Sequence, residues 1–302
     1  MHAATTTTNR NSARERVRFA PSPNGLLHLG HARSALLNWR FAKAREGLFL
    51  LRIEDIDVTR ARPEFEQAIC EDLDWLGIVW PDPPRRQSEH FDDYRRALEE
   101  LKKLDLVYPA FMSRAEAAGH IREAEAGGKV WPRDPDGVPL YPRQDRNLGA
   151  AERRRRIESG DPHGWRLDMR AALAGLTAGL SWRETGAGPA GETGEIAATP
   201  DVWGDVILAR RDVPSSYHLA VTVDDALQDI TTVVRGHDLF AATSVHRLLQ
   251  TILGLPAPNY LHHDLVRDET GRKLSKSDGD VSLASLRRKG FGPEDIARLA
   301  GL

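Results

Sequence analysis

The sequence predicts an α/β protein in which a parallel sheet is interrupted by a smaller inserted domain. Strand-like and helical segments alternate over residues 17–77, an order typical of parallel strands joined by helical crossovers. The alternation is lost over residues 109–200, which are rich in arginine, glycine and proline, and it returns after residue 201. A chain of 302 residues is long enough for such a sheet and an insertion, each with its own core.

The first elements follow from periodicity and from turn residues. Residues 17–20 (VRFA) predict a short strand, and residues 31–46 place apolar side chains at helical spacing before Gly47, a natural C-cap. Residues 48–55 (LFLLRIED) predict a buried strand. The next helix, over 63–77, starts with a proline and ends with a glycine.

The second half of the sheet is predicted from a similar pattern. Residues 217–223 (YHLAVTV) and 230–236 (ITTVVRG) predict strands, and residues 241–254 predict a helix. Residues 184–200 contain few apolar side chains and predict a flexible loop. The expected division of the chain is a disordered tail (1–15), the first half of the main domain (16–108), the inserted α+β domain (109–200), the second half (201–255) and a C-terminal segment with short helices (256–302).

Composition excludes several classes of protein. The formal net charge is -2, so any contact with nucleic acid needs a local basic patch, of which 152–160 (ERRRRIESG) is the densest candidate. Cys70 is the only cysteine, which excludes a disulfide framework and a cysteine-rich zinc site. The sequence has no apolar run of the roughly 20 residues needed to span a bilayer. We expect a cytoplasmic monomer without membrane contact.

Residues 25–31 (GLLHLGH) predict a phosphate site. His28 and His31 flank Gly30 where a loop enters a helix, and helix N-termini attract phosphate through unpaired amide groups and the helix dipole. Imidazole N–H groups donate to phosphate oxygens, and a glycine lets a ligand approach the backbone. The structural alternative is a helix start with surface histidines.

A second stretch, 268–280 (DETGRKLSKSDGD), places Lys273 and Lys276 between two glycines. Two lysines on a closing loop stabilise a departing pyrophosphate. The alternative is a solvated, charged loop. Neither G-x-x-x-x-G-K-[ST] nor G-x-G-x-x-G after a strand occurs.

The ordered pair HLGH and KLSKS resembles the HIGH and KMSKS signatures of the class I aminoacyl-tRNA synthetases. The stretches RFAPSPNG (18–25), RIEDID (52–57) and YHLAVTVDDALQDITTVVRGHDL (217–239) resemble the glutamyl branch of that family. The resemblance implies a Rossmann-like catalytic domain that uses ATP with Mg²⁺. The chain continues for about 25 residues beyond KLSKS, to residue 302, whereas full glutamyl-tRNA synthetases continue into a helical anticodon-binding region. This shape resembles the short group that esterifies glutamate to queuosine in the anticodon of tRNA(Asp).

The resemblance also implies a role for individual residues. His28, His31, Lys273 and Lys276 are the implied catalytic residues, and His28, Gly30, His31 and Lys276 the implied ATP ligands. The implied ligands of L-glutamate are Arg18, Phe19, Ala20, Pro21, Ser22, Glu54, Tyr217 and Arg235. Carboxylates of glutamate suit the guanidinium groups, and its ammonium group suits Glu54. The alternatives are an exposed charge for Arg18 and ion pairs of Glu54 with Arg52 and of Arg235 with Asp238.

One departure concerns metal. Members of the short group often bind zinc in the insertion through a C-x-C pair, a tyrosine and a further cysteine. In this sequence Ala110 and Met112 stand at the positions of the pair, and no cysteine follows Tyr141. We therefore predict that the insertion binds no zinc.

Three functions remain open at this stage. The first is activation of glutamate without tRNA, followed by transfer to queuosine of tRNA(Asp). The second is an ordinary glutamyl-tRNA synthetase fragment that charges tRNA(Glu). The third is a catalytically inactive relative that binds RNA or nucleotides, against which the intact histidines and lysines argue.

Overall fold

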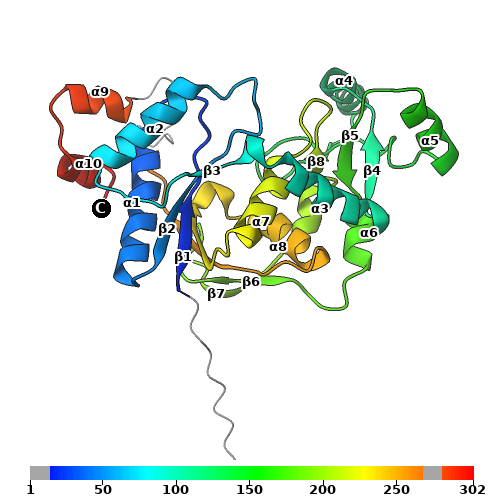
Figure 1. Cartoon of the computed structure of the whole chain (residues 1–302). Helices are drawn as coiled ribbons and strands as arrows, with labels where there is room; N and C mark the ends of the chain where they lie inside the picture. The colour runs from blue at the N-terminus through cyan, green and yellow to red at the C-terminus, as the bar shows by residue number, and fades with distance from the viewer. Residues whose placement is uncertain (1–13, 268–280) are drawn as a thin grey trace, which may run out of the picture.

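The structure is a computed structural model that describes residues 14–267 and 281–302, and it confirms the α/β class. Strands β1 (Arg16–Phe19), β2 (Leu48–Ile53) and β3 (Arg85–Arg86) form a parallel sheet in the order β1-β2-β3. Figure 1 shows this sheet near the centre of the molecule.

A second sheet continues beside it, in the order β7-β6-β10-β9. Strands β9 (Thr232–Gly236) and β10 (Asn259–His263) are parallel, β6 (Ser181–Glu184) pairs parallel to β10, and β7 (Gly194–Ala197) pairs antiparallel to β6. The backbone N–H of Thr231 donates to the carbonyl of Arg16 at 3.0 Å. The two sheets therefore meet where β1 lies beside β9.

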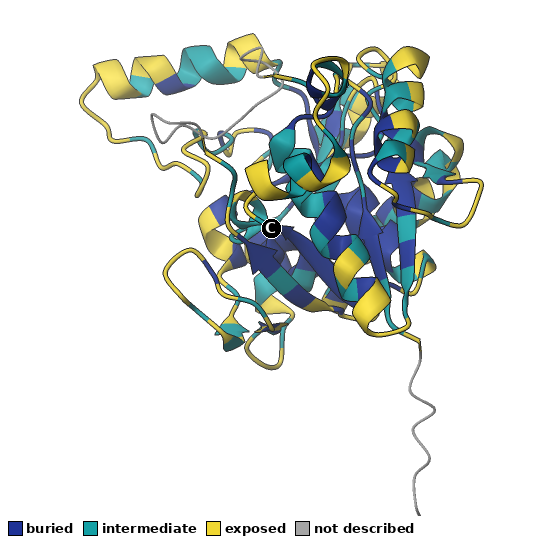
Figure 2. Ribbon diagram, turned by 90° about the vertical axis from the view of Figure 1, so that its left-hand side faces the viewer, coloured by how far each residue is buried: buried dark blue, intermediate teal, exposed yellow. Residues whose placement is uncertain are grey.

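Helices cover the first sheet on the side where the described chain ends (Figure 1). Helices α1 (Leu29–Ala44), α2 (Pro63–Trp75), α9 (Leu283–Arg288) and α10 (Pro293–Leu299) share an apolar core with β1 and β2. The C-terminal segment thus contributes short helices that pack on α1 and α2. In Figure 2 the strands beneath these helices are buried and the outer helix faces are exposed.

A second apolar core lies between three helices and a small antiparallel sheet of three short strands. Helices α3 (Phe91–Lys103), α7 (Tyr217–Leu227) and α8 (Thr243–Ile252) contribute most of it. Its buried side chains include Tyr94, Leu219 and Leu248, each 0% exposed. This core fixes the position of α7 against α3, α8 and β8.

The small sheet is antiparallel, with the order β4-β5-β8. Its strands and the helices around it are β4 (Val107–Ala110), α4 (Arg114–Ala126), α5 (Ala150–Glu158), β5 (Gly164–Leu167), α6 (Met169–Ala174) and β8 (Ile207–Ala209). Strands β6 and β7 also come from the range 109–200, yet they extend the second sheet, in which β6 pairs with β10 and β7 pairs with β6. The division into domains stays a prediction.

The strand predicted over 217–223 is wrong, because these residues form the first two turns of α7. Helix α7 is buried on several faces by α3, α8 and β8, so its consecutive apolar residues imitate the run of a buried strand. The hydroxyl of Thr222 donates to the carbonyl of His218 at 2.7 Å, a bond that a threonine makes within a helix.

The flexible loop predicted over 184–200 is wrong in part. Residues of β7 pair with β6 in register, Trp182 opposite Ile196, and Trp182 packs with Val233 and Tyr260. The sheet edge supplies hydrogen-bond partners that the local composition does not predict. The other predicted strands and helices occur, with ends shifted by a few residues.

Two expectations lie outside the described residues. They are the tail, of which only Arg14 and Glu15 are described, and the lysines Lys273 and Lys276. Among the helices of the described ranges, none combines the length and the apolar character needed to cross a membrane.

Candidate active site

A cavity of about 450 Å³ contains every predicted ligand that the structure describes. It lies at the carboxyl ends of β1, β2 and β9, the edge at which parallel sheets bind ligands. Residues that line it are Arg18, Phe19, Ala20, Pro21, Ser22, His28, Gly30, His31, Glu54, Tyr217 and Arg235. The predicted ligands thus lie at one site, although they are up to 217 positions apart in the chain, from Arg18 to Arg235.

The two histidines cap helix α1. His28 is the N-cap, and its Nδ1 accepts the N–H of Gly30 at 3.1 Å, while Nδ1 of His31 accepts the N–H of His28 at 3.2 Å. A neutral imidazole that accepts at Nδ1 carries its proton at Nε2. The capping bonds therefore select, on both rings, the tautomer that donates from Nε2. The ring centroids lie 3.9 Å apart.

The cap itself requires a glycine at position 30, apart from any ligand. A Cβ atom at Gly30 would lie 2.9 Å from Cε1 of His28, closer than real Cβ contacts. The sequence prediction explained the glycine by the approach of a ligand; the structure adds the ring of His28 as a steric reason.

We expect Gly30→Ala to displace the His28 ring, which costs the helix about 1 kcal/mol as a lost N-cap and lowers ATP-dependent activity. Gly119→Ala is the matched control, because a Cβ there meets only Arg122, at 3.9 Å, within α4. Urea unfolding and kinetics for ATP measure both effects. A Gly30→Ala protein with wild-type KM for ATP would contradict this role.

The described chain on both sides of the KLSKS stretch adjoins the histidine turn. Val266 lines the cavity, Ser282 forms an antiparallel bridge with His28, and the N–H of Leu283 donates to the carbonyl of Leu27 at 2.8 Å. The two ends of the segment that carries Lys273 and Lys276 are therefore near the cavity.

Arg18 is 4% exposed and is held by a carboxylate that the sequence analysis did not assign. Its Nε and Nη2 donate to Asp225 at 2.9 and 3.4 Å. Nη1 of Arg52 donates to Asp225 at 2.8 Å, and Nη2 of Arg52 donates to Glu54 at 3.3 Å. The order Arg18–Asp225–Arg52–Glu54 links β1, α7 and β2 through alternating charges.

Burial and charge act in opposite directions on the two carboxylates of this series. Burial alone would raise the pKa of Asp225, but Arg18 and Arg52 outweigh it and hold that pKa below its ordinary value. Burial dominates at Glu54 and raises its pKa, although Arg52 and Arg18 oppose the change. A cationic group of a ligand beside Glu54 would stabilise its charged form.

Asp224, the neighbour of Asp225, also anchors this helix. It is 0% exposed and accepts from Nε of Arg85 at 2.7 Å, from Gln87 at 2.8 Å and from the hydroxyl of Tyr94 at 2.9 Å. Neighbouring Asp224 and Asp225 thus fix α7 to β2, β3 and α3. The signal in the sequence was a pair of acids inside an apolar run.

Arg235 on β9 is 4% exposed and donates to four neutral groups. Nε donates to Nε2 of His262 at 3.1 Å, Nη1 lies 3.2 Å from Nδ1 of His246, and Nη2 donates to the carbonyl of Leu239 at 3.0 Å and to the hydroxyl of Thr243 at 2.7 Å. A guanidinium has five N–H donors. These bonds leave one N–H of Arg235, on Nη1.

The imidazoles around Arg235 are neutral at pH 7. Burial, with a further contribution from Arg235, lowers the pKa of His218 and of His262 to about 4 and that of His246 well below its ordinary value. Burial also raises the pKa of Tyr217 to about 12, so its hydroxyl stays protonated. Arg235 is therefore fixed without neutralisation by these side chains, which leaves a positive charge at the cavity wall.

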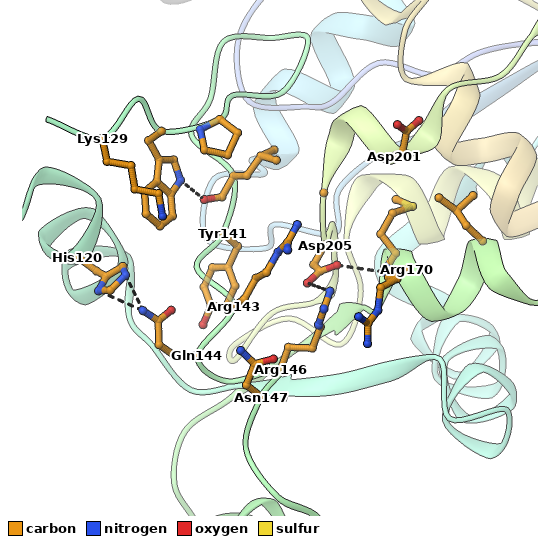
Figure 3. A pocket seen from close by; sticks show the side chains of 16 residues that line it. His120, Lys129, Tyr141, Arg143, Gln144, Arg146, Asn147, Arg170, Asp201 and Asp205 are labelled. Carbon is orange, nitrogen blue, oxygen red and sulfur yellow. Dashed lines mark hydrogen bonds and ion pairs between the residues drawn. The ribbon is translucent and has the colours of Figure 1, made fainter. Parts of the chain in front are cut away.

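A larger cavity, of about 670 Å³, lies between α4, α6 and the segments 129–147 and 201–205 (Figure 3). It contains none of the predicted ligands. The basic run 152–160, most of which belongs to α5, does not line this cavity, and no residue of α5 is buried, as expected of a solvated helix face.

Comparison with known proteins identifies the family. Residues 15–302 match the family model described as tRNA synthetases class I (E and Q), catalytic domain. The chain is 45% identical over 290 residues to a glutamyl-Q tRNA(Asp) synthetase of Rhodobacter capsulatus, with 95% of this chain and 99% of that protein covered. It is 37% identical to a glutamate–tRNA ligase of Prochlorococcus marinus, with 93% of this chain and 56% of that protein covered.

Solved structures give the same result. The glutamate-tRNA synthetase of Elizabethkingia anophelis matches with a TM-score of 0.79 and 32% identity, over 95% of this chain and 61% of that one. A glutamate tRNA ligase of Elizabethkingia meningosepticum in complex with its amino acid matches with a TM-score of 0.78. The resemblance found in the sequence is confirmed, and the chain belongs to the class I aminoacyl-tRNA synthetases, in the catalytic-domain family of the E and Q enzymes.

Proposed function

We propose that this protein activates L-glutamate with ATP, without need of tRNA, and transfers it to queuosine in the anticodon of tRNA(Asp). The observation that carries the proposal is the shared cavity of about 450 Å³. Two guanidinium groups and a carboxylate line it beside two imidazoles whose donor atoms are fixed by capping bonds. This is the set of charges that an acidic amino acid and a triphosphate require together.

Glutamate fits the charged side of the cavity. Its ammonium group pairs with Glu54, whose charged form burial disfavours until a cation arrives. Its carboxylates take the N–H groups that Arg18 and Arg235 do not use within the protein. The hydroxyl groups of Ser22 and Tyr217 line the same space and complete the recognition.

The activation step follows from positioning and charge. An oxygen of the α-carboxylate of glutamate attacks the α-phosphorus of ATP. The new O–P bond forms as the bond to the β-phosphate oxygen breaks, which gives glutamyl-adenylate and pyrophosphate. His28 and His31 donate from Nε2 to phosphate oxygens, and Lys273 and Lys276 neutralise the departing pyrophosphate. Mg²⁺ enters with ATP and supplies further neutralisation of phosphate charge.

The acceptor is proposed from similarity. The relative named a glutamyl-Q tRNA(Asp) synthetase is 45% identical to this chain over 99% of its length, whereas the chain spans 56% of the glutamate–tRNA ligase of Prochlorococcus marinus. The alternative acceptor is the 3′ end of tRNA(Glu). We propose that the enzyme acts as a monomer.

Transfer of radiolabelled glutamate distinguishes the acceptors. We expect label on tRNA(Asp) that contains queuosine, and background levels on tRNA(Asp) without it and on tRNA(Glu). Periodate, which cleaves vicinal diols, should block acceptance at the cyclopentene diol of queuosine when the 3′ end is already protected by aminoacylation. Label on tRNA(Glu) alone would establish the alternative and refute queuosine as the acceptor.

A further inference from the structure

The insertion departs from the zinc-binding pattern at its ligand positions. Ala110 offers no ligand atom, and Met112 offers only a thioether, whereas zinc sites in proteins use thiolate, imidazole or carboxylate groups. Among the described residues no group of three or more His, Cys, Asp or Glu side chains could hold a metal ion. The residues at this place therefore do not fit zinc.

A carboxylate lies where these positions meet. Oδ2 of Asp145 accepts the N–H of Phe111 at 2.7 Å, the N–H of Met112 at 3.0 Å and the hydroxyl of Tyr141 at 2.5 Å. Asp145 is 4% exposed. Ala110, Met112 and Tyr141 can be found from the sequence pattern, whereas Asp145 cannot, since a lone aspartate in a loop gives no signal.

We propose that Asp145 replaces the metal of the insertion: its carboxylate accepts three hydrogen bonds, and the two from Phe111 and Met112 join the end of β4 to the segment 141–149. The arrangement reverses the polarity of a zinc site. A metal cation gathers anionic side chains, whereas this anion gathers N–H and O–H donors. Bonds to a charged acceptor are stronger than neutral ones, so a single buried carboxylate suffices to hold the two segments.

Three arginines contact Phe111 and Tyr141, two of the residues that donate hydrogen bonds to Asp145. Arg166 stacks over the Tyr141 ring at 3.8 Å, and Arg156 over the Phe111 ring at 3.9 Å. Nη2 of Arg211 donates to the carbonyl of Phe111. The rings of Phe111 and Tyr141, whose backbone N–H and hydroxyl donate to Asp145, are thus each covered by an arginine side chain.

The carboxylate also fixes a wall of the larger cavity. Gln144 and Arg146, on either side of Asp145, line that cavity, and Figure 3 shows Arg146 pointing toward Asp205. Nη1 of Arg146 lies 3.7 Å from Oδ2 of Asp205. We therefore expect the shape of this cavity to depend on Asp145 and not on a metal.

The first test removes the carboxylate from the full-length protein. We expect Asp145→Ala to lower Tm by roughly 5 °C or more, since it leaves buried donors unpaired, and to speed hydrogen exchange of the Phe111 and Met112 amides by at least ~10-fold. Asp134→Asn is the control, because Asp134 also accepts two backbone N–H groups but in an exposed turn. Unchanged exchange at these amides in Asp145→Ala would overturn the proposal.

The second test restores a metal. The triple variant Ala110→Cys, Met112→Cys, Asp145→Cys should bind one Zn²⁺ per chain and lose stability in EDTA, whereas the wild type should contain no stoichiometric zinc and keep its Tm in EDTA. Zinc in the purified wild type, or a wild-type Tm that falls with EDTA, would overturn the proposal. Should the triple variant not fold, the exchange rates of Asp145→Ala and the wild-type EDTA measurement still decide the question.

Discussion

Replacing Arg235 by alanine should lower kcat/KM for glutamate in pyrophosphate exchange by about 10²–10³-fold, or ~3–4 kcal/mol. The guanidinium is buried, is surrounded by neutral imidazoles and presents its charge to the cavity. A carboxylate of the substrate is its natural counter-ion, and the loss of a buried partner costs more than that of an exposed one. Arg235→Lys should recover part of the activity, because it keeps the charge but loses the fork of donors.

The control for this result is Arg247→Ala. Arg247 lies on α8 and bonds to the carbonyl of Ser181 and to Gln250, so its loss perturbs the same layer without touching the cavity. Thermal unfolding of both variants separates a local loss from a folding defect. A folded Arg235→Ala protein with an unchanged KM for glutamate would show that Arg235 does not bind glutamate.

Replacing Asp225 by asparagine should lower the free energy of unfolding by about 3–5 kcal/mol at pH 7. The substitution removes the carboxylate that pairs with buried Arg18 and one of the three carboxylates that pair with buried Arg52. Asp229→Asn is the matched control: its carboxylate is exposed and 3.5 Å from Arg16, a pair worth at most about 1 kcal/mol. Urea unfolding of the two variants measures the difference.

The effect of Asp225 should depend on pH in a defined direction. Its pKa is lower in the folded protein than in the unfolded chain, so its contribution is complete above the ordinary aspartate pKa, about 3.9. The contribution is lost as pH falls through the folded pKa. The gap in stability between wild type and Asp225→Asn should stay constant from neutral pH to about pH 5 and narrow below pH 4. A gap that widens in acid would contradict the assignment.

The site was predictable from the sequence where its residues belong to short motifs. His28, Gly30 and His31 form a recognisable turn. Arg18 and Arg235 lie near the ends of strands and Glu54 directly follows one, in stretches that resemble a known family. The same stretches did not identify Asp225 or His262, because their roles depend on what packs against them. A buried aspartate is a functional clue only when its guanidinium partners are known to lie nearby, and these come from strands far away in the chain.

The fold was predictable where local pattern and tertiary context agree. Helix α1 and strand β2 carry both the periodicity and the end signals that the alternation requires. Helix α7 was misread because burial on several sides removes the polar face that marks a helix. Strand β7 was missed because its stability comes from pairing with β6 and not from its own residues.

We propose that one cavity brings glutamate and ATP together without RNA. Glutamate-dependent exchange of labelled pyrophosphate into ATP, measured with Mg²⁺ and no tRNA, tests it most directly. The wild-type protein should exchange label only when L-glutamate is present, and His28→Ala should abolish the exchange. Exchange that appears only after tRNA(Glu) is added, or that never appears with saturating glutamate and ATP, would contradict it.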